Sequence, residues 1–309
     1  MNILQFASAT LHLMFPPVCV FCLDPLRHAN TELEPGGKVH PMEVRLWGRG
    51  GNSIAGSRGY LPMGPLMGPL MGPMLAADGA TPPFCSLCHA DLVGNVWDAC
   101  PCCAAPRKAG RCAYCAERPY AFDESYALGL YQETMQEAVL RTKQARFECL
   151  TLGLGQLLGK MLHETRVWQR ILGSNLRSPS NLSTTGLIYP PLQWTIPVPC
   201  HWTRRLKRGV HSAALLAEGV AVALNVPLAT RAIRAVRRTK KQGTLAPHHR
   251  FQNVRDVFRA SKRYDFTGAH VLLVDDVMTT GATLHEASRT LKRAGAVKVS
   301  VAVVARGTG

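Results

Sequence analysis

Two adjacent aspartates and the threonine-rich turn after them form the most specific chemical pattern in the sequence. Asp275 and Asp276 follow the apolar run VLLV, and the turn MTTGAT comes directly after them. Paired carboxylates can accept hydrogen bonds from sugar hydroxyls. A small-residue turn that opens a helix presents backbone N–H groups and the positive end of the helix dipole to a phosphate. The pattern therefore predicts a site for a ligand that carries both groups, such as a phosphosugar.

A second candidate for phosphate chemistry is a basic segment that follows the motif PVP. It contains Arg204, Arg205, Lys207 and Arg208. Their charges suit a pyrophosphate group, although a solvated basic face would have the same composition. The whole chain has 36 Lys and Arg against 20 Asp and Glu, a formal charge of +16. This excess favours phosphate-bearing partners such as nucleotides, phosphosugars or nucleic acid, without choosing among them.

Cysteine spacing predicts a metal-binding N-terminal module. The chain has 11 cysteines, an odd number that suits a disulfide framework poorly. Four CxxC pairs are present: Cys19 and Cys22, Cys85 and Cys88, Cys100 and Cys103, Cys112 and Cys115. Two residues between cysteines allow both thiolates to bind one tetrahedral ion, and two pairs complete a closed site. We therefore predict two structural zinc sites that carry no catalysis.

The spacing of the four pairs allows more than one grouping around the two ions. The short separation of the last two pairs favours one site from Cys100, Cys103, Cys112 and Cys115, which leaves Cys19, Cys22, Cys85 and Cys88 for the other. A cross-braced arrangement remains an alternative, and Cys102 competes with Cys103 as a ligand.

Alternating apolar patterns after Cys115 predict an α/β domain with a mostly parallel sheet. The expected strands are 125–131, 194–199, 269–276 and 297–306, and the expected helices are 134–144, 151–172, 211–225 and 285–296. Ligands of such sheets bind beyond the carboxyl ends of the strands, where Asp275 and Asp276 are expected. The apolar positions of the basic region 231–258 are too sparse for a core element, and residues 172–186 are expected to form a polar loop.

The chain is long enough for about two domains. We predict a zinc module over residues 1–118 and an α/β domain over residues 119–309. Residues 23–84 are rich in Gly and Pro, and the run LPMGPLMGPLMGPM excludes regular structure, so this insertion is expected to be disordered. The apolar N-terminus lacks the basic region of a signal peptide, and no apolar segment is long enough to span a membrane. We expect a cytoplasmic protein.

The stretch VLLVDDVMTTGATL closely resembles the phosphoribosyl-pyrophosphate loop of type I phosphoribosyltransferases. The order of LHLMFPPVCVFC, the CxxC series, IPVPCHWTRRLKRG, KKQGTLAPHHRFQNVRDVF and the terminal loop resembles the ComF family, which includes competence proteins and GntX-like proteins. The resemblance covers nearly the whole chain apart from residues 23–84 and the loop near 172–191. It implies the type I phosphoribosyltransferase fold behind a double zinc ribbon.

The resemblance also implies roles for the residues of the predicted site. Asp275 and Asp276 would contact the ribose 2′ and 3′ hydroxyls, and the basic segment 204–208 would bind the pyrophosphate of phosphoribosyl pyrophosphate. The 5′-phosphate would be held by Thr279, Thr280, Gly281, Ala282 and Thr283. Mg²⁺ is implied with the substrate, because a pyrophosphate leaving group needs its charge neutralised.

Two departures from the family leave the acceptor substrate unnamed. Purine-salvage members of the superfamily carry an aspartate at the position of Thr279, and its absence argues against purine salvage. The chain has RGVHS at residues 208–212 where the family commonly has RGFNQ. A candidate hood over the acceptor lies within residues 231–254. The rival interpretation is a protein of DNA uptake that binds phosphoribosyl pyrophosphate and single-stranded DNA, or competence proteins, without turnover.

Overall fold

The computed structural model describes residues 18–24, 26, 84–93, 97–115, 119–165, 190–200, 211–237, 239 and 247–308. The predicted pyrophosphate residues Arg204, Arg205, Lys207 and Arg208 lie outside the described residues. So do nearly all of the insertion at 23–84 and the polar loop at 172–186.

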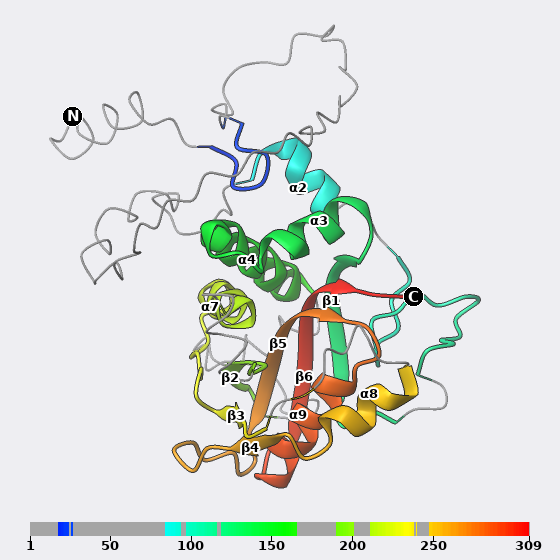
Figure 1. Cartoon of the computed structure of the whole chain (residues 1–309), viewed down its shortest axis with the longest axis vertical. Coiled ribbons are helices and arrows are strands. Elements are labelled where there is room, and N and C mark those ends of the chain that lie inside the picture. The colour runs from blue at the N-terminus through cyan, green and yellow to red at the C-terminus, as the bar shows by residue number, and fades with distance from the viewer. Residues whose placement is uncertain are drawn as a thin grey trace, which may run out of the picture.

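A four-stranded sheet forms the centre of the molecule (Figure 1). Its strand order is β1 (Glu124–Leu130), β6 (Lys298–Arg306), β5 (His270–Met278) and β2 (Leu192–Pro197). All three pairings are parallel. Every residue of β6 is buried, and the first five residues of β5 are buried as well, because both strands are covered on both faces. The predicted α/β fold with a mostly parallel sheet is confirmed.

One face of the sheet is covered by three helices, α3 (Glu133–Arg141), α4 (Glu148–Glu164) and α7 (Ser212–Leu224), which pack together with α2 (Ser86–Val93) in one apolar core. A short 3-10 turn, Ala145–Phe147, joins α3 to α4. The axes of α4 and α7 approach closely at two glycines. A Cβ on Gly155 would lie 2.3 Å from the Leu216 carbonyl oxygen, and a Cβ on Gly219 would lie 2.3 Å from that of Leu152.

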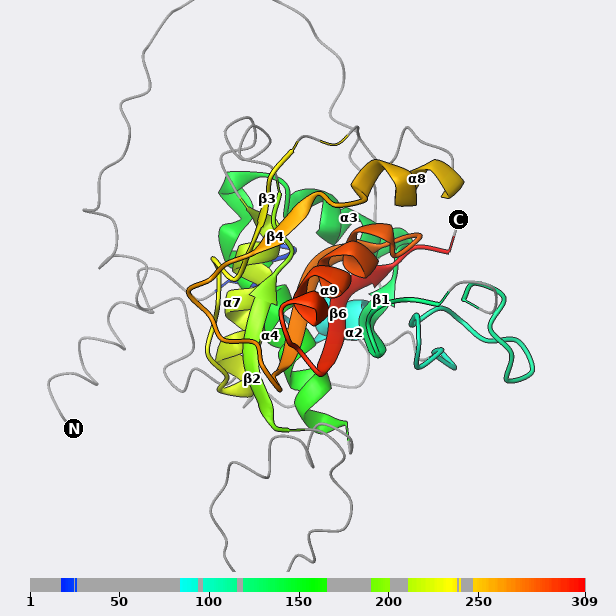
Figure 2. The ribbon, with the colours of Figure 1, turned by 90° about the horizontal axis from the view of Figure 1, so that it is seen from below.

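The opposite face carries α9 (Ala282–Arg293) and α8 (Pro247–Val254), which contact each other. Figure 2 shows α9 in front of β6 and residues 97–115 beside β1, whereas α4 and α7 lie on the other side of the sheet. The helix α9 forms because its apolar residues recur at helical spacing, and Leu284, Ala287 and Leu291 are buried against the sheet.

The prediction for residues 231–258 was wrong. This region contains α8 and a two-stranded antiparallel sheet of β3 (Ile233–Ala235) and β4 (Phe258–Ala260). Ile233, Val254 and Phe258 are buried in the core below α9. The apolar residues are sparse, but among those whose burial the structure describes only Val236 is exposed, and strands of three residues are too short to show a period. The sequence also gave no indication of α2.

The described residues thus form two apolar cores, one on each face of the sheet, and each core contains one group of cysteines. Among the described helices none is both long and apolar enough to cross a bilayer.

Candidate functional site

The acid pair lies near the carboxyl end of the central strand β5. Asp275 pairs with Val303 of β6, and the strand continues to Met278. The strand therefore extends two residues beyond the acids, whereas the sequence predicted its end at Asp276. Both side chains are partly buried at the edge of the sheet where the carboxyl ends of parallel strands meet.

Burial and mutual repulsion set the electrostatics of the pair. Burial, followed by the neighbouring Asp276 carboxylate, raises the pKa of Asp275 to about 8. The backbone N–H of Asp276 donates to Asp275 Oδ1 at 2.9 Å and opposes this shift, as does the charge of Lys143. Lys143 Nζ forms an ion pair with Asp276 Oδ2. The acid pair therefore includes a carboxylate in contact with an ammonium group.

Lys143 was not anticipated from the sequence. It stands between α3 and the 3-10 turn, 133 positions before its partner. A single lysine directly after a helix is typical of a solvated residue at a helix C-terminus. No local pattern in the sequence indicates its contact with the acid pair.

The turn after β5, residues 279–283, is the segment that the sequence predicts to hold a phosphate, and we call it the phosphate loop. Gly281 adopts φ 72°, directly before the first residue of α9. A Cβ at this position would lie 2.8 Å from Cε1 of Tyr120, so both the backbone conformation and the space require glycine. The Oγ1 atom of Thr280 is buried and has no hydrogen-bond partner among the described residues. An unpaired buried hydroxyl at a helix N-terminus is suited to a phosphate oxygen.

The helix α8, from the basic region 231–258, reaches the same loop. Arg250 Nη1 donates to Thr279 Oγ1 at 3.2 Å. Its neighbour Phe251 packs edge to face on His285 of α9, with ring centroids 5.7 Å apart. These contacts place α8 next to Thr279. The remaining loop residues, Ala282 and Thr283, begin α9.

The eight cysteines of the CxxC pairs form two groups. Cys19, Cys22, Cys85 and Cys88 make up the first cluster, and Cys100, Cys103, Cys112 and Cys115 make up the second cluster. Within each cluster the sulfur atoms lie within 4.8 Å of one another. This is the grouping that the short separation of the last two pairs favours, rather than the cross-braced alternative.

The sulfur geometry suits a tetrahedral ion. The Sγ atoms of Cys22 and Cys85 are 3.7 Å apart, and those of Cys103 and Cys112 are 3.5 Å apart. Zinc–sulfur bonds of about 2.3 Å place tetrahedral ligands about 3.8 Å from one another, so the clusters could bind zinc. Cys102 is outside the cluster, and its carbonyl oxygen accepts a hydrogen bond from Ser125 at 2.9 Å.

Comparisons with known proteins agree with this geometry. A model of the phosphoribosyl transferase domain matches residues 207–308. Competence protein F of Haemophilus influenzae is 27% identical over 199 residues, which cover 64% of this chain and 79% of that protein. The DNA utilization protein YhgH of Salmonella typhimurium is 27% identical over 237 residues, which cover 71% of this chain and 95% of that protein.

A solved structure of the hypoxanthine phosphoribosyl transferase of Trypanosoma cruzi is also similar. It is 17% identical, with a TM-score of 0.29, and the similarity covers 49% of this chain and 64% of that chain. The sequence relatives and the domain match, taken with the parallel sheet and the two cysteine clusters, confirm the resemblance that the sequence indicates.

Proposed function

We propose that this chain, a homologue of Competence protein F and YhgH that carries a phosphoribosyl transferase domain, binds phosphoribosyl pyrophosphate together with Mg²⁺. The observation that carries the proposal is the direct succession of an acid pair and a phosphate loop at the end of β5. Asp275 and Asp276 accept hydrogen bonds from the ribose hydroxyls. Thr279, Thr280, Gly281, Ala282 and Thr283 hold the 5′-phosphate, with the unpaired Thr280 hydroxyl as one donor.

The proposed reaction is displacement at the anomeric carbon of the ribose. The bond from that carbon to the pyrophosphate oxygen breaks, its electron pair leaves with pyrophosphate, and an acceptor atom forms the new bond. Positive charge builds on the sugar ring meanwhile, and a nearby carboxylate stabilises it. The acid pair and the loop fix the two ends of the sugar, so most of the catalytic effect comes from positioning.

Lys143 and the metal ion would neutralise the negative charges of the acid pair and of the pyrophosphate. Lys143 favours ionised carboxylates in the acid pair. The basic residues Arg204, Arg205, Lys207 and Arg208 are proposed to bind the pyrophosphate. Mg²⁺ would bind mainly through the substrate's phosphates and neutralise the leaving group. The two cysteine clusters are proposed to hold structural zinc, because closed sites of four thiolates leave no open coordination position.

Calorimetric titration with phosphoribosyl pyrophosphate and Mg²⁺ tests binding. Near neutral pH the double variant Asp275→Asn, Asp276→Asn should bind roughly 10- to 100-fold more weakly, because the charge-assisted hydrogen bond of the ionised Asp276 contributes about 1.5–3 kcal/mol. Asp265→Asn is a matched control, since Asp265 is exposed outside the site. If the folded wild-type protein did not bind this ligand, the proposal would be wrong.

Turnover is tested separately, by measuring pyrophosphate release with a panel of nucleobases, amines and other acceptors. If the wild-type protein releases pyrophosphate and the double aspartate variant does not, the protein is an enzyme. Binding without release across the whole panel would support the second candidate function instead.

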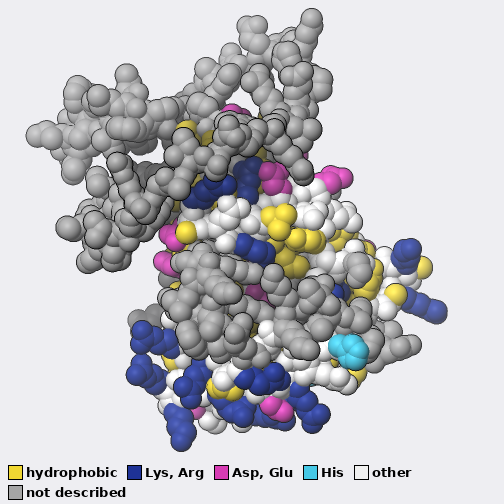
Figure 3. Space-filling view, viewed as in Figure 1, with side chains coloured by type: hydrophobic (Ala, Val, Ile, Leu, Met, Phe, Trp, Pro, Cys, Tyr) yellow, Lys and Arg dark blue, Asp and Glu magenta, His cyan; other side chains and the backbone are white. Residues whose placement is uncertain are grey.

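The second candidate is a non-catalytic protein that binds single-stranded DNA, and a basic surface favours it. Figure 3 shows Lys and Arg side chains gathered over the part of the molecule that holds β3, β4 and α9. We define this basic face by its exposed residues Arg234, Arg237, Arg255, Arg259, Lys262, Arg263 and Arg293.

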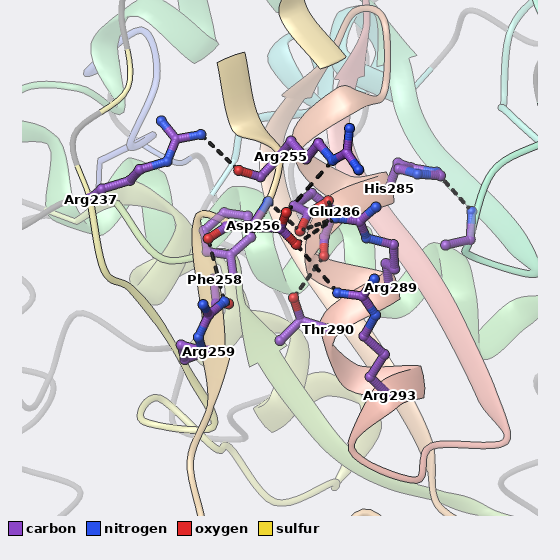
Figure 4. A network of polar contacts seen from close by, with 11 residues as sticks. Arg237, Arg255, Asp256, Phe258, Arg259, His285, Glu286, Arg289, Thr290 and Arg293 are labelled. Atoms are coloured by element: carbon purple, nitrogen blue, oxygen red, sulfur yellow. Dashed lines mark hydrogen bonds and ion pairs between the residues drawn. The ribbon is translucent and has the colours of Figure 1, made fainter. Parts of the chain in front are cut away.

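Little acidic charge offsets the basic face. Figure 4 shows Arg255, Arg289 and Arg293 turned toward Asp256. The Asp256 carboxylate forms ion pairs with Arg289 at 2.9 Å, Arg293 at 3.3 Å and Arg255 at 3.6 Å. Three guanidinium groups thus share one exposed carboxylate, and Arg289 also contacts Glu286. The surface keeps a positive excess that suits a phosphate backbone.

Binding of a single-stranded oligonucleotide at increasing salt concentration tests this candidate. The triple variant Arg259→Ala, Lys262→Ala, Arg263→Ala should weaken binding and reduce the salt slope by about 2, since each lost phosphate contact removes about 0.7 on single strands. The control variant Lys108→Ala, Arg111→Ala, Arg146→Ala removes the same charge outside the basic face. Equal effects of the two triple variants would reject the basic face as the DNA site.

A further inference from the structure

A buried arginine stands behind the phosphate loop. Arg306, the last residue of β6, is 1% exposed. Its Nη1 atom donates to the carbonyl oxygens of Met278 at 2.9 Å and Thr279 at 2.6 Å, and also to that of Gly307. No carboxylate lies within ion-pair distance of Arg306 in the described part of the chain. A buried cation without a carboxylate is costly, so its partners have to be well placed.

These contacts orient the loop. In a trans peptide unit the carbonyl oxygen and the following N–H point in opposite directions. Arg306 takes the carbonyl oxygens of Met278 and Thr279, and the Tyr120 hydroxyl donates to that of Thr280 at 3.0 Å. The N–H groups of Thr279, Thr280 and Gly281 therefore point away from Arg306 and Tyr120, toward the side where an anion can bind. The carbonyl contacts thus prepare the donors for a phosphate.

Arg306 also forms a hydrogen bond with a residue of the second cluster. Arg306 Nε donates to the carbonyl oxygen of Cys103, one of the four thiolate residues, at 2.7 Å. The guanidinium also lies 5.4 Å from the ring centroid of Tyr114, and the Tyr114 hydroxyl donates to the Thr308 carbonyl at 3.0 Å. Tyr114 stands between Cys112 and Cys115 in the sequence. A divalent ion with four thiolates carries a net negative charge, and this charge favours a nearby cation such as the Arg306 guanidinium.

We infer that Arg306 is a positioning residue of the phosphate loop and that metal at the second cluster holds it in place, so that phosphate binding and metal binding are linked. The inference rests on the proposed function, because it assigns the loop to the 5′-phosphate. Linkage is reciprocal: if the metal strengthens phosphate binding, the phosphate must strengthen metal binding by the same factor.

The first test compares two arginines that each donate to a cysteine knuckle. Ribose 5-phosphate is titrated calorimetrically into the metal-loaded protein and into its Arg306→Met and Arg306→Lys variants. We expect Arg306→Met to weaken binding roughly 5- to 150-fold, the usual range of coupling between sites. Arg306→Lys should lose less, because it keeps the charge but not the forked donors.

The matched control for these variants is Arg141→Met. Arg141 Nη1 donates to the carbonyl oxygen of Phe21, between Cys19 and Cys22 of the first cluster, at 2.6 Å. Arg141 has no contact with the phosphate loop in the described structure, so affinity should stay within about 2-fold of wild type. An equal loss of affinity in Arg141→Met and Arg306→Met would overturn the inference.

The second test needs no change at Arg306, which matters if its variants fail to fold. In the Cys19→Ser, Cys22→Ser variant, Co²⁺ replaces the metal at the second cluster and provides a visible absorption spectrum. Addition of ribose 5-phosphate should shift this spectrum with the midpoint found by calorimetry. In the Cys112→Ser, Cys115→Ser variant, Co²⁺ at the first cluster should show no shift.

The outcomes separate this inference from the proposed function. If calorimetry detects neither ribose 5-phosphate nor phosphoribosyl pyrophosphate, the proposed function fails and the inference with it. If ribose 5-phosphate binds while the cobalt spectrum of the second cluster stays unchanged, the inference alone is wrong.

Discussion

The two cysteine clusters have the same ligands but serve different parts of the molecule. The first cluster packs into the core shared by α3, α4 and α7, and the second packs into the core of α9 on the opposite face of the sheet. Arg141, whose side chain is 28% exposed, contacts the first cluster and also pairs with Glu137 of its own helix. Arg306 contacts the second cluster and otherwise donates to the phosphate loop. A group of four cysteines can therefore be connected either to a core helix or to the candidate phosphate loop, depending on what its arginine contacts.

Removing the metal from either cluster should have the largest effect on stability. We expect about two zinc ions per chain and about one after Cys19→Ser with Cys22→Ser, or after Cys112→Ser with Cys115→Ser. Both variants should unfold at a much lower temperature, because structural zinc contributes its binding free energy to folding. Only the second pair of changes should also weaken binding of ribose 5-phosphate. Metal analysis, thermal unfolding and calorimetry measure these three effects, and equal affinities in the two variants would break the comparison.

The next largest effect is expected at the close approach of α4 and α7. Gly155→Ala should destabilise the protein by about 1–3 kcal/mol, because its Cβ would overlap a backbone carbonyl that cannot move aside. Affinity for ribose 5-phosphate in the folded protein should not change, because α4 and α7 pack on the face of the sheet opposite α9. Gly153→Ala is the matched control in the same helix, where the nearest atom is 3.0 Å away in the Phe84 ring. Thermal unfolding of both variants, followed by calorimetry below the transition, checks the prediction.

The acid pair should give a smaller, pH-dependent effect. Asp275 ionises with a pKa of about 8 in the folded protein, against 3.8 ordinarily. Between these values the unfolded chain binds fewer protons than the native one, so stability falls as pH rises through this window. Asp275→Asn removes the dependence and should raise the melting temperature by roughly 2–6 °C near pH 8 but by less near pH 5. If the gain in melting temperature of Asp275→Asn over the wild type increased toward low pH, the predicted direction of the pH dependence would be wrong.

The smallest effect on stability is expected at Thr280. Thr280→Val removes a buried hydroxyl that has no hydrogen-bond partner among the described residues, so the melting temperature should stay the same or rise slightly. Affinity for ribose 5-phosphate should fall about 10-fold, because a hydrogen bond to a charged phosphate is lost. Thr290→Val provides the contrast, since its hydroxyl donates to the Glu286 carbonyl at 2.9 Å on the same helix. Unchanged affinity in Thr280→Val would exclude this hydroxyl from the phosphate site.

Local patterns in the sequence predicted the parts of the site that are contiguous in the chain. The acid pair, the turn and α9 follow one another directly, so one stretch of sequence contains the strand, the candidate ligand-binding residues and the helix. Lys143, Tyr120 and Arg306 reach this stretch from other elements, and none of them belongs to a motif. The short strands β3 and β4 were missed for a related reason: three residues show no period, and their burial depends on α9.

The place of β6 in the sheet has a consequence for biosynthesis. β6 is the last strand in the sequence, yet it lies between β1 and β5 and is buried along its whole length. Until a ribosome has released residues 298–306, β1 and β5 lack the strand that joins them, and their apolar edges stay open. Long-range pairing of this kind is slow and leaves nascent chains prone to aggregation. The sheet therefore stays incomplete while the ribosome makes all the residues between β1 and β6.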